Sequence, residues 1–177
     1  NTESVVQGFC RRNATFKLIN GKELPNGWLG KNHACHSLSE TAKGEYYLFL
    51  DADVRIESDI IERSISTLKK KRSVLLSVFP RQIMITKGEK KVVPIMNQIL
   101  LSLLPLFLVR ASKKTSLSAA NGQFMFFSAK EYTILKPHKE LKDSPVEDIS
   151  ILKYYKKKRF KCITLLGNND ISCRMYH

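Results

Sequence analysis

The sequence has few cysteines and no spacing that would pair them. Cys10, Cys35, Cys162 and Cys173 form no CxxC pair and no regular framework. Small secreted domains that depend on disulfides carry dense, regularly spaced cysteines. We therefore expect four reduced thiols and a cytosolic setting.

Acidic residues are scarce as well. The 16 aspartates and glutamates are outnumbered by 30 lysines and arginines, which leaves a net charge of +14 over 177 residues. Such an excess concentrates anions near the protein, whether nucleic acid, nucleotide phosphates or anionic lipid headgroups. Beyond this charge the sequence shows no nucleic-acid-binding motif and no stacking platform, so we expect no nucleic-acid partner.

An uninterrupted apolar run long enough to cross a bilayer is also missing. Residues 92–109 are almost wholly apolar but are interrupted by Pro94, Asn97, Gln98, Ser102 and Pro105. A buried core helix is one interpretation. A helix lying in the membrane interface is favoured by the basic residues on both sides, which are Lys87, Lys90, Lys91, Arg110, Lys113 and Lys114. We expect residues 92–114 to be a membrane-interface segment, peripheral or monotopic, at the cytoplasmic face of the cell membrane.

The sequence does contain an alternation of strand-like and helix-like segments. Apolar runs predict strands at residues 15–19, 46–50 and 74–79. Helical periodicity predicts one helix at residues 32–43, capped by Asn32 and stopped by Gly44, and another from a Ser58 cap to the basic run 69–72. The alternation favours an α/β fold with a mixed, mostly parallel sheet flanked by helices, in a single domain of residues 1–177.

Two aspartates follow one of the predicted strands directly. Asp51 and Asp53 stand one residue apart at the end of the apolar run 46–50. Ligands of open α/β sheets bind at the carboxyl ends of the strands, and two carboxylates there suit Mg²⁺ or Mn²⁺. The alternative is that Asp51 caps the following helix and Asp53 lies in solvent.

Other candidate side chains stand at predicted turns and helix starts. Glu147 and Asp148 precede a helical pattern, where a carboxylate is either a cap or a general base. Gly122 follows Asn121 in a polar turn before a strand and would let the backbone approach a ligand closely. A metal site at the cluster of residues 33–36 is not favoured, because His33 and Cys35 point apart on a helix.

Taken together, several motifs carry a resemblance to a known family. Residues 27–31 (GWLGK), 44–54 (GEYYLFLDADV), 121–123 (NGQ), 146–148 (VED) and 173–176 (CRMY) occur in one order. The chain from about residue 24 to 176 resembles the inverting family 2 glycosyltransferases of GT-A fold. It is most similar to the branch that glycosylates membrane lipids such as carotenoid acids, with its hopanoid-associated relatives.

The resemblance implies a role for each matching residue. Asp51 would contact the ribose and the metal of a nucleotide sugar, and Asp53 would bind Mg²⁺ or Mn²⁺ directly. Asp148 would be the catalytic base, with Glu147 beside it. The nucleotide sugar would also meet Trp28 and Gly122, and its diphosphate would meet Lys31 and Arg174. The implied reaction is metal-dependent, inverting transfer of one sugar from a nucleotide diphosphate sugar, with UDP as the expected nucleotide, to a lipid acceptor at an anionic membrane surface.

The sequence departs from the family in two places. Family members begin with a strand and loop that recognise the base, and the chain opens at what looks like the tail of that segment, so it is expected to be a fragment. The Gln-x-x-Arg-Trp signature of processive synthases is absent, which favours a single sugar transfer.

Two other classes of protein compete with this interpretation. Residues 50–54 also fit the first motif of haloacid-dehalogenase-type phosphatases, with Asp51 as nucleophile and Asp53 as acid/base. Ser77 and residues 167–170 would then supply the later motifs, although Asn168 stands where an aspartate is wanted. A non-catalytic basic module for anionic membranes would explain the net charge but not Asp51, Asp53 and Asp148.

Overall fold

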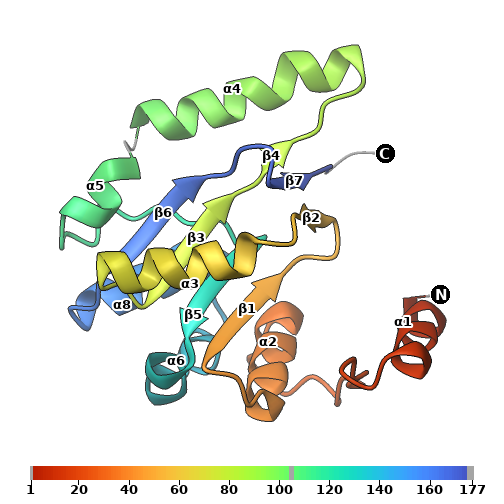
Figure 1. Ribbon diagram of the computed structural model, residues 1–177. Helices are drawn as coiled ribbons and strands as arrows, with labels where there is room; N and C mark the ends of the chain where they lie inside the picture. Colours follow the sequence, from red (N-terminus) through yellow and green to blue (C-terminus); the bar gives the residue numbers. More distant parts are fainter. Residues whose placement is uncertain (1, 104–105, 175–177) are drawn as a thin grey trace.

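A four-stranded mixed sheet forms the centre of the molecule in the computed structural model, which describes residues 2–103 and 106–174 (Figure 1). Its strands lie in the order β1 (Tyr46–Leu50), β5 (Phe124–Ser128), β3 (Leu75–Phe79) and β6 (Cys162–Leu166). β5 is antiparallel to both of its neighbours, while β3 and β6 are parallel. Three strands thus share one direction and β5 opposes them. The α/β class, the mixed sheet and the flanking helices are as predicted.

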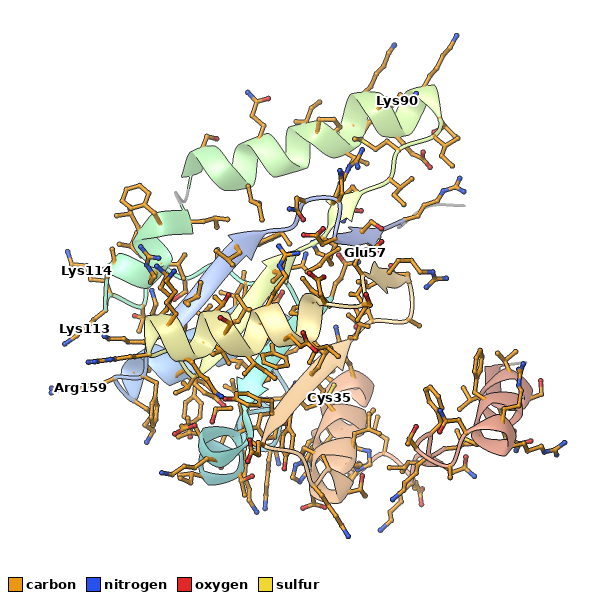
Figure 2. All side chains as sticks on the ribbon, viewed as in Figure 1. Cys35, Glu57, Lys90, Lys113, Lys114 and Arg159 are labelled. Atoms are coloured by element: carbon orange, nitrogen blue, oxygen red, sulfur yellow. The ribbon has the colours of Figure 1, made fainter. Side chains whose placement is uncertain are left out.

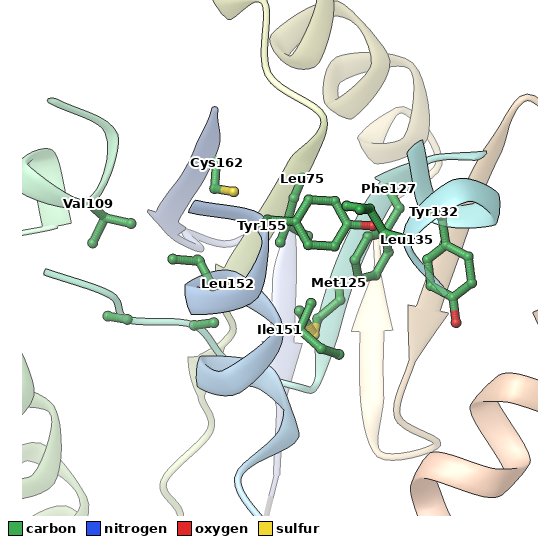
Figure 3. Packing of buried hydrophobic residues seen from close by; sticks show 12 residues of the cluster. Leu75, Val109, Met125, Phe127, Tyr132, Leu135, Ile151, Leu152, Tyr155 and Cys162 are labelled. Carbon is green, nitrogen blue, oxygen red and sulfur yellow. The ribbon is translucent and has the colours of Figure 1, made fainter. Parts of the chain in front are cut away.

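The two faces of this sheet pack against different helices because side chains alternate along each strand. On one face, Phe124 and Phe126 of β5 pack with Ile60 and Leu68 of α3 (Ile60–Lys71). On the other face, Phe127 packs with helices α5 (Leu106–Ala111), α6 (Ala129–Leu135) and α8 (Glu147–Lys157). Figure 3 shows Tyr155, Ile151 and Leu152 of α8 lying over this second face. The core therefore lies on both sides of a sheet whose central strands are fully covered.

A smaller sheet continues from the carboxyl ends of the main strands. It consists of β2 (Val54–Ile56), β7 (Ile171–Cys173) and β4 (Arg81–Gln82), with β7 in the middle. β2 follows β1 after a turn of three residues, β4 follows β3, and β7 follows β6. The small sheet thus lies at the carboxyl edge of the main sheet, where Asp51 and Asp53 were expected to bind a ligand.

Most predicted elements are confirmed, with shifted ends. The strands at 46–50 and 74–79 are β1 and β3, and the predicted helix after Ser58 is α3. The helix predicted at 32–43 is α2 (Gly30–Thr41), and Asn32 is not its cap. The buried Asn32 side chain instead donates hydrogen bonds to the carbonyl groups of Leu141, Lys142 and Ser144 just before α8. Asn32 therefore fastens α2 to the segment that leads into α8.

The strand predicted at residues 15–19 is wrong. These residues form an irregular, mostly exposed segment after α1 (Thr2–Arg12), with Phe16 and Ile19 largely unburied. A strand needs a partner for its backbone groups, and no strand among the described residues pairs with this segment. Its apolar residues are therefore not sufficient to make it a strand.

The predicted interface segment forms two helices, α4 (Lys87–Leu103) and α5, and α4 lies outside the main sheet (Figure 1). Val92 and Ile95 of α4 and Phe107 of α5 each expose more than half of their surface. Pro105 lies outside the described residues, as do Met175 and Tyr176 of the CRMY motif. In the part of the chain that the structure describes, no helix is both long enough and apolar enough to cross a membrane. The remaining helix, α7 (Pro137–Glu140), is a single turn between α6 and α8.

Candidate active site

Asp51 and Asp53 lie at the carboxyl end of β1, as the sequence predicted. The Asp51 N–H donates to the carbonyl of Gln123, and the Val54 N–H donates back to the carbonyl of Asp51, both at 3.1 Å. This tight turn sends the two carboxylates in different directions. Asp51 faces α2, whereas Asp53 faces β7.

An ion-pair cluster connects three elements at this edge. The Lys31 ammonium, in the first turn of α2, lies 2.9 Å from a Glu147 carboxylate oxygen and 3.4 Å from one of Asp51. Burial lowers the pKa of Lys31, but the two carboxylates outweigh it and raise that pKa above its ordinary value. Lys31 is therefore a half-exposed cation held between Asp51 and Glu147.

Asp148 is held rigidly beside this cluster. Its Oδ2 accepts a hydrogen bond of 2.9 Å from the Gly122 N–H, and its Oδ1 accepts one of 2.7 Å from the Ile149 N–H. Burial raises the pKa of Asp148 above the usual aspartate value, and the bond from Ile149 opposes this shift. A raised pKa makes a carboxylate a stronger base, which is the property that general-base catalysis requires. Asp148 is the second residue of α8 and not its cap, which is Val146, and its bond with Gly122 fixes the turn before β5.

Gly122 has no side chain, and this leaves room for the Lys31 ammonium and the Glu147 carboxylate beside it. A Cβ at this position would lie 3.1 Å from the Lys31 Nζ and 3.2 Å from the Glu147 Oε1. Contacts this short would force the ion pair to move. The glycine therefore leaves room for the close approach of two charged side chains. Close approach of the backbone to a ligand at this position stays a prediction.

Asp53 has two partners that the sequence analysis did not identify as site residues. The Gln123 side-chain amide donates to its Oδ2 at 3.3 Å, and the Cys173 thiol lies 3.0 Å from the same oxygen. Burial, together with the Asp53 carboxylate, raises the pKa of Cys173 to about 11, so the protonated thiol donates to Asp53. Both residues lie in motifs quoted above, but only the antiparallel register of β5 on β1 and the pairing of β7 with β2 bring them to Asp53.

The donor set decides which metal could bind here. Among the described residues there is no group of three or more histidine, cysteine, aspartate or glutamate side chains that could enclose an ion. Mg²⁺ is commonly held by one or two carboxylates and completes its shell with water and substrate phosphates. Either carboxylate, that of Asp51 or that of Asp53, fits this mode of binding, although the turn points the two in different directions, Asp51 toward Lys31 and Asp53 toward Cys173.

Trp28 and Arg174 are placed apart from the ion-pair cluster. The Trp28 ring packs against His33 and His36 of α2, each with ring centroids 5.4 Å away. Arg174 directly follows β7, and its Nη2 lies 4.0 Å from the Glu89 carboxylate in the first turn of α4. The buried Arg174 Nε has no hydrogen-bond partner. Contacts of these two residues with a nucleotide sugar stay predictions.

A cavity of about 450 Å³ lies between α2 and β1 and opens onto the cluster. Lys31, Asp51, Gly122 and Glu147 line one end of it. Cys35 and His138 line it as well, and burial lowers the pKa of His138 to about 4. His138 is therefore neutral at physiological pH and adds no charge to the cavity. The cavity is large enough for part of a small-molecule ligand.

The structure does not support a role for Ser77 as a ligand-binding residue in the phosphatase interpretation. Ser77 has no exposed surface, and its hydroxyl bonds to the backbone N–H and carbonyl of Asn121 at 2.8 and 3.0 Å. It fixes the turn before Gly122 and is not presented to a ligand. The fold thus uses Ser77 to position the site.

Comparisons with known proteins show the fold. No protein-family model matches the chain, and no curated protein sequence does. Among solved structures, residues 1–349 of TarS from S. aureus, crystallised in complex with UDP-GlcNAc, superpose with a TM-score of 0.57 at 13% sequence identity. The match covers 99% of this chain and 46% of the TarS chain, so the chain spans less than half the length of that structure.

Proposed function

We propose that this chain forms the catalytic part of a glycosyltransferase that moves a single sugar from a nucleotide diphosphate sugar to an acceptor. One observation carries the proposal: Lys31, Asp51, Asp53 and Asp148 come together at one edge of a sheet whose fold is that of the TarS structure. That structure holds UDP-GlcNAc, which makes a UDP-linked sugar the first donor to test.

The residues divide the chemistry between them. Lys31 supplies positive charge for the diphosphate leaving group, which is stabilised by cations placed where its charge develops. Asp148, held by the Gly122 and Ile149 N–H groups, is placed to take the proton from an acceptor hydroxyl. Attack on the face opposite the leaving group inverts the anomeric configuration.

A divalent ion is part of this proposal. Asp53 and Asp51 would hold Mg²⁺ or Mn²⁺, which when bound neutralises charge on the diphosphate oxygens. The protein contributes two carboxylates on a short turn, and Gln123 and Cys173 keep that of Asp53 in position.

We further propose a lipid-type acceptor at an anionic membrane surface. Support comes from the exposed apolar side chains Val92, Ile95 and Phe107 of α4 and α5, which stand between basic residues. If the acceptor is a carboxylic acid, it is already ionised at neutral pH, and Asp148 would mainly position it.

The direct test is release of UDP from a UDP-sugar in the presence of Mn²⁺ and candidate lipid acceptors. We expect release to depend on metal and acceptor, and the product to have inverted configuration. Metal-dependent phosphate release from small phosphoesters, with no UDP release, would contradict the proposal and support the phosphatase alternative.

A further inference from the structure

The same tetrapeptide, Lys-Lys-Lys-Arg, occurs twice in the chain, at residues 69–72 and 156–159. Each copy ends a helix, α3 or α8, and each leads within three residues into a strand, β3 or β6. The closing hydrogen bonds are the same: the Ser73 N–H donates to the Leu68 carbonyl, and the Phe160 N–H donates to the Tyr155 carbonyl, both at 3.0 Å. The two copies are thus one structural unit used twice.

The sheet brings these two turns side by side. β3 and β6 are adjacent and parallel, and Leu75 stands opposite Cys162 in their register. The Val74 N–H donates to the Lys161 carbonyl at 3.0 Å, which joins the segments just before the strands. The two turns therefore lie next to each other at the amino edge of the sheet, and the helices α3 and α8 reach them from opposite faces.

A third basic segment is fastened next to them. The buried Lys156 ammonium donates to the backbone carbonyl groups of Lys114 and Leu117. This places Lys113 and Lys114 beside the C-terminal end of α8. Figure 2 shows Lys113, Lys114 and Arg159 on the same side of the molecule, near the end of α3. We call residues 69–72, 113–114, 157–159 and 161 the basic surface; all ten are exposed.

Helix stability alone does not explain this surface. Cations at a helix C-terminus do favour the helix dipole. However, Arg72 and Arg159 have positive φ angles of 51° and 63°, a backbone conformation in which glycine is the more stable residue. Both units therefore carry a charged side chain at the position where a neutral glycine would close the helix with less strain.

The charges of the basic surface are not neutralised within the protein. No ion pair among the described residues involves any member of the surface. Ten like charges in one area repel one another, and an external anionic surface would remove that repulsion.

We propose that the basic surface docks the protein on an anionic lipid bilayer. The surface continues into α5, where Arg110 is exposed and Phe107 exposes 67% of its surface. An exposed aromatic side chain next to clustered lysines suits the boundary between headgroups and acyl chains. This inference does not depend on the proposed sugar transfer.

Docking by this surface also sets the orientation of the domain. Glu147 and Asp148 are at the other end of α8, whose 11 residues span about 16 Å at 1.5 Å per residue. The candidate active site would stay open to a nucleotide sugar from solution, and an acceptor in the same bilayer would have to reach about that far from the headgroups.

Cosedimentation with vesicles of phosphatidylcholine and phosphatidylserine tests the proposal. Two triple variants are compared with the parent: Lys69→Gln/Lys70→Gln/Lys71→Gln and Lys157→Gln/Lys158→Gln/Lys161→Gln. A lysine at an anionic surface contributes about fivefold in partitioning, so we expect each triple variant to bind roughly a hundredfold more weakly. Salt at ~1 M should release the parent, because screening shortens the range of these charges.

The matched control is Lys17→Gln/Lys22→Gln/Lys43→Gln, which removes three exposed lysines elsewhere. It should bind nearly as well as the parent, and circular dichroism should show all variants folded. Equal weakening by the control would show a net-charge effect and overturn the proposal. Tight binding of the parent to double-stranded DNA with no binding to the vesicles would overturn it too.

Discussion

At the scale of single residues, Asp148 makes the most specific prediction. Asp148→Asn keeps the shape of the side chain but removes the proton acceptor, so turnover on a hydroxyl acceptor should fall roughly 10²–10⁴-fold. Donor binding should survive, because the Lys31 ion pairs remain. Steady-state kinetics with a separate measurement of donor affinity checks both expectations.

The pH profile gives the same residue a second test. The base works only when ionised, and burial raises the pKa of Asp148. Activity should therefore rise with pH through a value above the usual aspartate range, and this acidic limb should vanish in the residual activity of Asp148→Asn. An unchanged limb in the variant would mean that another group acts as the base.

Gly122 provides a prediction based on space. In Gly122→Ala the new methyl group would meet the Lys31 Nζ and the Glu147 Oε1 at the short distances given above. We expect donor binding to weaken by about tenfold, equivalent to one charge-assisted hydrogen bond, with little loss of stability. Gly21→Ala is the control, since a Cβ there meets nothing within 4 Å. Equal donor affinity in the two variants would contradict this account of Gly122.

At the scale of elements, two tyrosines of the same core cluster are expected to behave in opposite ways. The buried Tyr155 hydroxyl on α8 has no hydrogen-bond partner, whereas the Tyr132 hydroxyl on α6 lies 2.6 Å from the His138 Nδ1. Tyr155→Phe should leave the free energy of unfolding unchanged or raise it, and Tyr132→Phe should lower it by about 1–3 kcal/mol. Denaturant unfolding of both variants measures this. A larger loss in Tyr155→Phe than in Tyr132→Phe would show that the assignment of partners is wrong.

Some of the helices and strands could be predicted from the sequence and others could not. β1, β3 and α3 were predictable because each is a compact apolar or amphipathic run with clear ends. The sequence does not reveal the antiparallel direction of β5, because the side-chain pattern of a strand is the same in parallel and antiparallel pairing. The 15–19 segment has enough apolar residues for a strand but pairs with no strand in the described part of the chain, and pairing depends on the tertiary structure.

The same distinction holds within the site. The sequence makes Asp51, Asp53, Glu147 and Asp148 candidates because carboxylates at strand ends and helix starts are visible in it. Gln123 and Cys173 reach Asp53 only through the pairing of β5 and β7 with β1 and β2. Asn32 looked like a helix cap from its position alone, and its actual partners are more than 100 residues away.

At the scale of the whole molecule, ten of the 30 basic residues form the basic surface, which is separate from the candidate active site. The candidate active site combines one cation with several carboxylates at the carboxyl edge of the sheet, whereas the basic surface occupies the opposite edge. This division separates a site for a small charged substrate from a surface for an extended anionic partner. The net charge of +14 therefore says little about the site itself.

Metal-dependent nucleotide binding is measured directly by calorimetric titration of the protein with UDP, GDP, CDP and ADP, each with and without Mn²⁺. We expect metal-dependent binding of at least one of them. We also expect loss of that binding in folded Asp53→Ala and retention in the control Asp143→Ala, which changes an exposed aspartate outside the site. Binding that is independent of Mn²⁺ and unchanged by Asp53→Ala would contradict a metal-dependent nucleotide site at Asp53.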